Sequence, residues 1–392
     1  MKQYLLVLLL SFTGMLSTIC AQDIQLGPES RISVLTCGPG SDLYSKFGHT
    51  AFRVQDPALG LDWVYNYGTF DFDQPNFYLK FARGQLDYAL SRQQFPNFLY
   101  VYQLESRWVR EQWLDLQPAE RQEVFEFLEE NYRPQNRFYK YSFLRENCAT
   151  KIPDILQQSL SGELQIASDE ERLDKTFRDL IQSNLHTNSW SSFGIDLALG
   201  ARIDRGATAK ERQFLPEYVM EQLTGAVYNG KPLIAYDRVV LDLESPDTLL
   251  YFTATPLFWL LVLLILTIAI TWIDFKNKSR SRLMDGVLFL LTGLAGLFLF
   301  FLWFLTDHQD TVWNANLLWA FPANLLLGYL LLVRAEAPAW VPNYLKGLAA
   351  AIGVCALLWL FGIQVFSPLV LVIWLTLFLR IAFLLHHYTS RN

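Results

Sequence analysis

The sequence predicts an exported α+β domain followed by an all-α transmembrane bundle of about five helices. Three observations predict this arrangement: a charged and then apolar N-terminus, a charge-bearing region over 22–250, and a region over 251–392 dominated by Leu, Phe, Trp, Ala and Val. The overall hydrophobic content of 52% is high for a soluble protein. Its uneven distribution implies that the two regions of the chain lie in different solvents.

The N-terminus has the features of a secretory signal peptide. Lys2 supplies a positive charge ahead of an apolar segment, and small residues follow it. We therefore expect residues 1–21 to be removed and the domain over 22–255 to be exported. Lipidation of Cys20 is the alternative, although Ile19 is not the small residue that a lipidation signal places before its cysteine.

Short β-branched and aromatic runs, separated by turns that contain Gly and Pro, predict a mixture of strands and helices in the exported domain. Asn147 is the expected N-cap of a helix that begins at Cys148. Pro153 lacks a backbone donor, so we expect this helix to be kinked or to begin later. The prediction places strands at 32–35, 49–54, 62–70, 85–92 and 107–114, helices at 76–84, 118–132, 173–185, from 148 and from 216, and a hairpin at 228–230.

The C-terminal region contains segments of ~17–22 largely uncharged residues, each long enough to span a bilayer. The loop 276–282 carries four basic residues, and no Lys or Arg lies between Arg282 and Arg334. The positive-inside rule therefore places this loop and the C-terminus in the cytoplasm, and the domain over 22–255 outside. The predicted transmembrane domain, 256–392, has helices at about 256–273, 284–305, 317–333, 344–361 and 369–385.

One cysteine and one histidine of the exported domain form a candidate catalytic pair. Cys148 stands at the predicted start of a helix, and His49 at the predicted start of a strand. A helix N-terminus and a neighbouring imidazolium lower the pKa of a thiol, and the thiolate is the nucleophilic form. The alternative is that Cys148 is a buried small hydrophobe and His49 a hydrogen-bonded core histidine. The scarcity of histidine, five in the chain, favours the catalytic interpretation.

A hairpin symmetric about the turn at 57–60 would place His49 opposite Gly68. Because side chains alternate along a strand, Asn66 would then share the face of the histidine and could orient its ring. A slip of one residue would put Tyr65 or Tyr67 in that place instead.

Further residues are expected to contact substrate around this pair. Cys37 is a rival nucleophile without a helix N-terminus, and it could instead form a disulfide with Cys148. Polar residues at the outer end of a membrane helix are costly and often functional, although an ordinary polar loop is the alternative. The expected substrate-binding residues are Cys37, Tyr67, Asn147, Asp307, His308 and Asn316.

Several classes of partner are not expected. The net charge of -6, without a basic patch, argues against nucleic acid. The sequence contains no Cys-x-x-Cys, phosphate-loop or zinc-helix motif, so we expect no metal and no cofactor.

Several long motifs resemble one known family. They are "LTCGPGSDLYSKFGHTAFRV", "VYNYGTFDF", "FYLKFARG", "NYRPQNRFYKYSFLRENCAT" and "RQFLPEY", with "NLLWAFPANLLLG" in the membrane region. They resemble the Lnb-type lipoprotein N-acyltransferase family of Bacteroidota, and the resemblance covers nearly the whole chain. It implies a circularly permuted papain-like (NlpC/P60-like) exported domain, in which the histidine strand precedes the cysteine helix.

The resemblance also implies an activity and a location. Cys148 matches the nucleophile of the family and His49 its base, while Asn66 as the third member comes from the hairpin argument. The implied reaction is transfer of an acyl chain from a membrane phospholipid, through a thioester on Cys148, to the N-terminal amine of a diacylglyceryl-cysteine lipoprotein. The protein would then lie in the bacterial inner membrane, with its N-terminal domain in the periplasm.

Two other functions remain open at this point. Permuted NlpC/P60-like folds often cut cell-wall peptides, so a membrane-tethered cysteine amidase or peptidase is one alternative. A non-catalytic envelope protein that binds lipid or acts as a scaffold is the other. A polar groove at Cys148 would favour the amidase, and an apolar route from Cys148 to the membrane helices would favour the acyltransferase.

Overall fold

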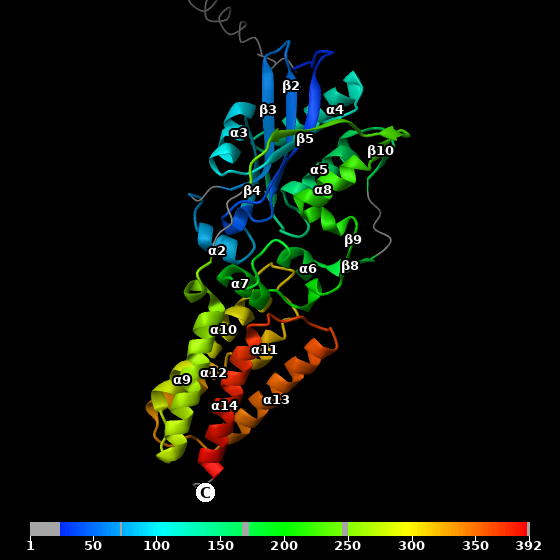
Figure 1. Ribbon diagram of the computed structural model, residues 1–392. Helices are drawn as coiled ribbons and strands as arrows, with labels where there is room; N and C mark the ends of the chain where they lie inside the picture. The colour runs from blue at the N-terminus through cyan, green and yellow to red at the C-terminus, as the bar shows by residue number, and fades with distance from the viewer. Residues whose placement is uncertain (1–23, 71–72, 167–171, 245–249, 390–392) are drawn as a thin grey trace, which may run out of the picture.

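The computed structural model describes residues 24–70, 73–166, 172–244 and 250–389. The predicted signal peptide and Cys20 lie outside these residues. A domain built around a β-sheet forms one end of the molecule, and a bundle of long helices forms the other (Figure 1). This arrangement confirms the predicted fold class of an α+β domain followed by a helical transmembrane bundle.

The exported domain is organised around one antiparallel sheet of seven strands. The strand order is β12-β5-β1-β2-β3-β4-β6, so β2 lies at its centre. The strands are β1 (Arg31–Cys37), β2 (His49–Asp56), β3 (Leu61–Thr69), β4 (Asp87–Gln94), β5 (Val109–Leu114), β6 (Phe138–Lys140) and β12 (Ile234–Leu241). Because β1, β2 and β3 follow one another along the chain and pair side by side, the central strands are fixed by short connections.

Helices cover both faces of this sheet. The larger core lies on one face, where Phe52 and Val54 of β2 pack with Ile152 and Leu156 of α5. Burial of this apolar surface is the main force that holds the helices on the sheet. The helices of this face are α4 (Pro118–Tyr132), α5 (Cys148–Ser159) and α8 (Pro216–Thr224), and α3 (Phe95–Leu104) covers the other face.

Two local predictions need correction, and one is confirmed. The sequence predicts no element over α3, where a helix starts with a proline in its first turn. The predicted helix 173–185 is shorter, because Thr176 and Asp179 form a capping box that starts α6 (Phe177–Gln182). The hairpin at 228–230 is confirmed, with Asn229 and Gly230 at positive φ.

Smaller elements complete the exported domain. They are α2 (Phe77–Ala82), α7 (Trp190–Ala198), β7 (Leu164–Gln165), β8 (Arg172–Thr176), β9 (Gly206–Thr208), β10 (Val227–Tyr228), β11 (Lys231–Pro232) and the 3₁₀ helices η1 (Leu43–Ser45), η2 (Ala201–Ile203), η3 (Glu211–Phe214) and η4 (Phe252–Ala254).

Within the described residues, five spans are long and apolar enough to cross a membrane. Four of them are unbroken helices: α9 (Pro256–Lys276), α10 (Arg282–Phe304), α13 (Val341–Leu360) and α14 (Val370–Thr389). The predicted continuous helix at 317–333 is instead two helices, α11 (Asn316–Trp319) and α12 (Asn324–Val333). Pro322 between them cannot donate a backbone hydrogen bond, which explains the break.

The side chain of Asn324 satisfies backbone and side-chain groups at this break. Its Nδ2 donates to the carbonyl oxygen of Trp319 at 3.1 Å, and its Oδ1 accepts from the hydroxyl of Tyr344 at 2.6 Å. An unpaired polar group inside a bilayer costs several kcal/mol, so these bonds make the broken helix tolerable there.

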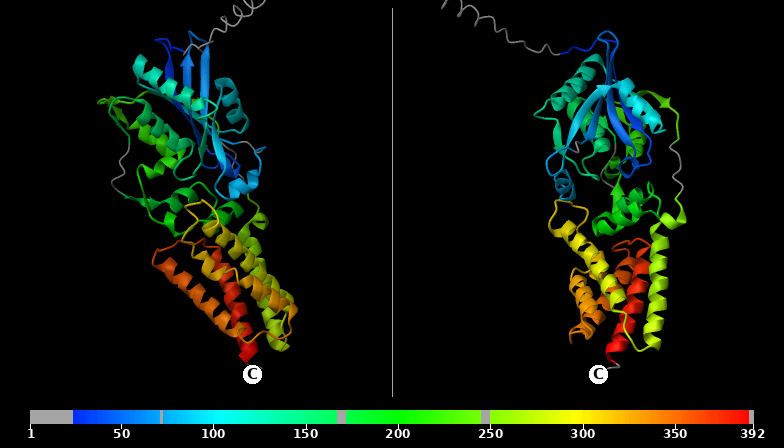
Figure 2. Two further views of the ribbon diagram at one scale, coloured as in Figure 1. Left: turned by 180° about the vertical axis from the view of Figure 1, so that it is seen from behind. Right: turned by 90° about the vertical axis from the view of Figure 1, so that its left-hand side faces the viewer.

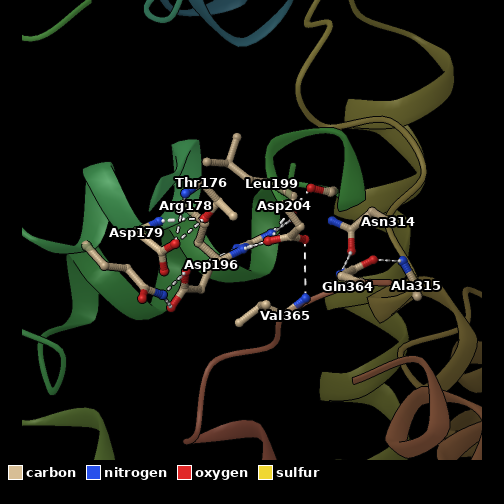
Figure 3. Close-up of polar contacts among 12 residues, drawn as sticks. Thr176, Arg178, Asp179, Asp196, Leu199, Asp204, Asn314, Ala315, Gln364 and Val365 are labelled. Carbon is tan, nitrogen blue, oxygen red and sulfur yellow. Dashed lines mark hydrogen bonds and ion pairs between the residues drawn. The ribbon is translucent and has the colours of Figure 1, made fainter. Parts of the chain in front are cut away.

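A buried polar cluster joins the exported domain to the membrane helices (Figure 3). The guanidinium of Arg178 donates to the carboxylates of Asp196 and Asp204, at 3.1 and 2.6 Å. Asp204 also accepts from the backbone N–H of Val365, in the loop between α13 and α14, at 3.2 Å. The amide of Asn314 donates to the carbonyl oxygen of Leu197 at 2.7 Å. The cluster therefore connects the exported domain to two loops of the helical bundle, the one that follows α10 and the one between α13 and α14.

Close backbone approach fixes the same junction. The N–H of Gly200 donates to the carbonyl oxygen of Asp310 at 2.9 Å. A Cβ at Gly200 would lie only 1.9 Å from the carbonyl oxygen of Val312, so a glycine is required there.

Candidate active site

The helix that carries the candidate nucleophile begins at Cys148, as predicted. The side-chain oxygen of Asn147 accepts hydrogen bonds from the backbone N–H groups of Ala149 and Thr150, at 2.8 and 3.0 Å. These bonds satisfy donors of the first turn and fix the start of the helix. The expectation that the helix begins later is wrong, because α5 is helical from Cys148 through Ser159 with Pro153 inside it. A kink at Pro153 stays a prediction.

The register of β2 and β3 is the one that the symmetric hairpin predicts. Phe52 lies opposite Tyr65, and continuing this register places His49 opposite Gly68. The side chain of Asn66 is on the face of His49, and its Oδ1 lies 3.2 Å from Nε2 of the ring. An amide oxygen only accepts, so Nε2 carries a proton, and Nδ1 is the ring nitrogen left for Cys148.

A threonine next to the histidine ties the strand to the helix. The hydroxyl of Thr50 donates to the carbonyl oxygen of Cys148 at 2.8 Å. Both Cys148 and His49 are half-buried, so the pair combines a protein environment with access from outside.

The two groups shift one another toward an ion pair. Burial alone would raise the pKa of the Cys148 thiol, but the charge of His49, a hydrogen bond to its ring and hydrogen bonds from Thr50 lower it below its ordinary value. Burial would lower the pKa of His49, but the charge of Cys148 and hydrogen bonds to Cys148 and Asn66 raise it. The arrangement therefore favours a thiolate beside an imidazolium, which is the reactive form of a cysteine nucleophile.

Three residues near the thiol were not selected from the sequence: Gly68, Tyr139 and Tyr141. Gly68 has a φ of +91°, at an irregularity in the β3–β4 pairing, and a Cβ there would lie 3.8 Å from the Cβ of Cys148. The same point lies 3.9 Å from the hydroxyl of Tyr139 and 3.9 Å from the ring of Tyr141. Tyr139 and Tyr141 stand in the motif "NRFYKYSFLRENCAT", so the resemblance contained the signal that would have identified them.

A shallow hollow of about 370 Å³ opens beside the histidine. Its lining residues are mostly polar, and three of them, Thr69, Ser91 and Arg92, also border a second hollow of about 280 Å³. The second hollow reaches Phe70. A substrate in the first hollow would lie against the Asn66 side of the histidine ring.

Cys37 is not equivalent to Cys148. It is buried, and its Cα pairs with that of His49 in the β1–β2 register. Burial raises the pKa of its thiol to about 12, so it stays protonated at neutral pH. Cys37 and Cys148 are both free thiols in the structure, without the disulfide that was the alternative.

Two expected substrate contacts are engaged within the protein instead. Asn147 is buried, and its Nδ2 donates to the carbonyl oxygens of Phe143 and Phe214, at 2.8 and 2.7 Å. Tyr67 borders the first hollow, but its side chain is buried in the larger core and its hydroxyl accepts from Asn131 at 3.0 Å. Asn147 therefore caps the helix and the Tyr67 side chain packs in the core, while contact of either residue with substrate stays a prediction.

The three residues that follow α10 and were predicted to contact substrate also have partners within the protein. Asp307 accepts from the amide of Gln85 at 2.8 Å. The ring of His308 packs on Gly84, since a Cβ at that glycine would lie 3.1 Å from its Nδ1. Asn316 is buried and accepts from the indole N–H of Trp319 at 2.9 Å. The loop therefore contributes contacts between the two domains, and substrate binding by these side chains stays a prediction.

The same loop reaches the start of the nucleophile helix. Arg145 donates two parallel hydrogen bonds to the carboxylate of Asp310, each at 2.7 Å. Since Arg145 precedes Cys148 by only three residues, the membrane domain contacts the segment that positions the thiol. In the described part of the chain, no group of three or more His, Cys, Asp or Glu side chains is placed to hold a metal ion.

Comparisons with known families find a match for each of the two domains of the chain. Residues 24–183 match the family model described as the Lnb N-terminal periplasmic domain. Residues 248–392 match the family model described as the Lnb transmembrane domain. No curated protein and no solved structure matches the chain.

Proposed function

We propose a function on the premise that this chain belongs to the Lnb family, whose two domain models match its periplasmic and transmembrane parts. It is a multi-pass membrane protein of the lipoprotein-modifying type, with its N-terminal domain in the periplasm. The proposed activity is N-acyl transfer: an acyl chain passes from a membrane phospholipid to the N-terminal amine of a diacylated lipoprotein. The five spans would return the C-terminus to the cytoplasm, in accord with its basic residues.

The first half of the proposed reaction acylates Cys148. Its thiolate attacks the ester carbonyl of the phospholipid, and the carbonyl oxygen becomes an oxyanion. As the tetrahedral intermediate collapses, the C–O bond of the ester breaks and the imidazolium of His49 gives its proton to the leaving alkoxide. The products of this half are a thioester on Cys148 and a free lysophospholipid.

The second half transfers the chain to the lipoprotein. The neutral amine of the diacylglyceryl-cysteine attacks the thioester carbonyl, and the neutral imidazole of His49 takes a proton from the attacking nitrogen. Breaking the C–S bond leaves an amide on the lipoprotein and restores the thiolate beside the imidazolium. Asn66 holds the ring through both halves, because its oxygen accepts from Nε2 at 3.2 Å while Nδ1 exchanges the proton.

The position of the thiol at the start of a helix would stabilise the negative charge of the oxyanion. Cys148 is the first residue of α5, where backbone N–H groups point out of the helix toward its N-terminal end. The N–H of Cys148 is therefore a candidate donor to the oxyanion.

One observation carries the proposal: a thiol with a lowered pKa and a histidine with a raised one lie together, with Asn66 on the far nitrogen of the ring. That pair belongs to a domain fastened directly to the membrane helices. Both substrates of the proposed reaction are anchored in the bilayer, so a membrane-fastened thiol suits them.

The experiment is mass spectrometry of the purified protein in phospholipid nanodiscs. The proposal expects an acyl adduct on Cys148 with phospholipid alone, and loss of the adduct with formation of an N-acylated product when a diacylated lipopeptide is added. Absence of any adduct and of any N-acylated product would reject it.

A second candidate function has one observation in its favour. The hollow beside His49 is bordered mostly by polar residues, among them Asn66, Ser91 and Gln93, which suits a peptide better than an acyl chain. A membrane-tethered cysteine amidase of cell-wall peptide would release peptide fragments from purified cell wall. Such release, without an N-acylated lipopeptide, would favour this candidate.

A further inference from the structure

The short helix α2 exposes an apolar edge that nothing in the described chain covers. Tyr78 is 80% exposed, Leu79 53% and Phe81 56%, whereas Phe77 on the inner side is buried. Lys80 and Arg83 lie in and beside the same helix. Aromatic and aliphatic side chains flanked by basic ones are typical of segments that lie in the interface of a bilayer.

The position of α2 places this edge at the level of the membrane surface. The carbonyl oxygen of Arg83 accepts from the backbone N–H of Asp307 at 2.9 Å. Asp307 is only three residues beyond Phe304, the last residue of the membrane helix α10. Figure 1 draws α2 at the end of the exported domain that faces the membrane helices, and the right-hand view of Figure 2 draws it over the loop that follows α10.

Aromatic rings also form the outer end of α10. Trp303 and Phe304 stack with their centroids 4.9 Å apart, and Trp313 lies 5.8 Å from Trp303 and is 68% exposed. Tryptophan gathers where membrane helices leave the hydrocarbon region. The exposed edge of α2 therefore continues an aromatic interface that the membrane helix already defines.

A row of aromatic rings leads from α2 toward the thiol. Neighbouring ring centroids are separated by 6.3 Å from Phe81 to Phe77, 5.9 Å from Phe77 to Phe70, 5.4 Å from Phe70 to Tyr88 and 4.1 Å from Tyr88 to Tyr141. Tyr141 borders the space at Gly68 that the Cβ of Cys148 also borders. Phe70, in the middle of this row, also lines the second hollow.

We propose that the exposed edge of α2 is seated in the outer leaflet of the membrane, and that the aromatic row behind it carries the acyl chain of a phospholipid toward Cys148. The edge would lower the cost of drawing an acyl chain out of the bilayer, because the chain passes from lipid to aromatic surface without crossing water. This inference rests on the proposed function only for the direction in which the chain travels; the seat of α2 in lipid does not depend on it.

The seat of α2 is tested by depth measurement in a protein that cannot react. A nitroxide is attached at Leu79→Cys in the Cys148→Ala protein, reconstituted in phospholipid nanodiscs, and a second sample carries it at Leu59→Cys. Leu59 is a matched control, since it is 48% exposed and lies in the turn between β2 and β3, at the end of the sheet away from the membrane helices (Figure 1). The Cys148→Ala parent corrects for label on other cysteines.

The proposal expects the label at 79 to be relaxed more by oxygen, which concentrates in lipid, than by a water-soluble nickel chelate, with the reverse at 59. Equal aqueous accessibility at both positions would overturn it. In the reactive protein, Leu79→Glu should lower kcat/KM for bilayer phospholipid by about tenfold, because a carboxylate is costly in the interface, while Leu59→Glu should change it less than about twofold.

Equal effects of the two glutamate variants would also overturn the proposal. A failure of the proposed function is distinguishable, because it would appear as the absence of any acyl adduct on Cys148 in the unmodified protein. The depth measurement would be unaffected by that result.

Discussion

The Cys148–His49 pair and the Arg178 cluster both hold charged groups inside the protein, and the two differ in how completely their hydrogen bonds are used. Every guanidinium nitrogen of Arg178 donates to a carboxylate or carbonyl oxygen, and the side chains of Asp196 and Asp204 are nearly inaccessible. His49 and Cys148 are half-buried, and a hollow opens beside the histidine. The Arg178 cluster is saturated, whereas the pair keeps room for a reacting group.

This difference shows how similar chemistry serves two purposes. A saturated buried ion pair resists change, because removal of one partner leaves an uncompensated charge. In the partly exposed Cys148–His49 pair, each group shifts the pKa of the other, which favours the reactive thiolate. Polarity alone therefore did not identify the functional residues, and five predictions test the comparison.

The largest effect is expected from Cys148→Ala. The variant should lose acyl transfer by a factor on the order of 10⁴ or more, because the nucleophile of the covalent step is removed. Transfer is measured by mass spectrometry of the lipopeptide product. Thermal unfolding of the detergent-solubilised variant serves as the control and should change little, since the thiol is not part of a saturated cluster. Transfer at more than a hundredth of the original rate would contradict the assignment.

The next effect is expected from Asp204→Asn in the Arg178 cluster. Arg178 would lose a buried charge partner, so the free energy of unfolding should fall by about 3 kcal/mol. The midpoint of urea unfolding in detergent measures this loss. Asp174→Asn is the matched control, because Asp174 pairs with Arg212 while its side chain is 87% exposed. That control should lose much less stability, because solvent screens an exposed pair, and equal losses would show that the cluster is not saturated.

The third prediction concerns pH and Asn66→Ala. Transfer requires thiolate and imidazolium together, so its rate should rise with pH through the lowered pKa of Cys148 and fall through the raised pKa of His49. Without the Asn66 hydrogen bond the pKa of His49 should fall, which moves the descending limb to lower pH and leaves the ascending limb nearly in place. We expect kcat/KM to fall by about 10 to 100-fold at neutral pH, since a base held only by the thiol is poorly oriented.

Alkylation of thiols provides an independent measurement of the same pair. Iodoacetamide should modify Cys148 at a pH well below 8, where an ordinary thiol with a pKa of about 8.5 reacts slowly. His49→Ala should move this reaction to higher pH, because burial then raises the pKa of the thiol without opposition from the imidazolium. Cys37 is the internal control and should stay unmodified, since it is buried and protonated. A pH dependence unchanged by His49→Ala would mean that the two groups do not interact.

The smallest effect is expected at the pair Arg145 and Asp310, which links the membrane loop to the nucleophile helix. Their side chains are 38% and 16% exposed, so solvent screens part of their attraction. A double-mutant cycle of Arg145→Ala and Asp310→Ala should give a coupling energy of about 0.5 to 1 kcal/mol in thermodynamic stability. A coupling energy as large as the stability loss expected for Asp204→Asn would show that solvent screens this pair no more than the Arg178 cluster.

The sequence by itself determined what local chemistry and solvent preference specify. The length of the turn at 57–60 set the register that brings Asn66 beside His49, and Asn147 set the start of the nucleophile helix. Long apolar runs determined the membrane spans, because a bilayer admits few charged residues. These features depend on residues close together in the chain, so a single sequence contains them.

Only the tertiary structure decided which polar residues make contacts between the two domains. Asp307, His308 and Asn316 were selected from the sequence as candidate substrate contacts, and the sequence did not show their partners within the protein. Asp307 and His308 contact segments more than a hundred residues away, and Asn316 contacts Trp319 beside a helix break. Arg178 had no recognisable signal, because its carboxylate partners Asp196 and Asp204 lie 18 and 26 residues further along the chain. Asp204 in turn meets the backbone N–H of Val365 only when the two domains dock. Whether a polar side chain is saturated depends on long-range packing, and periodicity along the chain does not encode that packing.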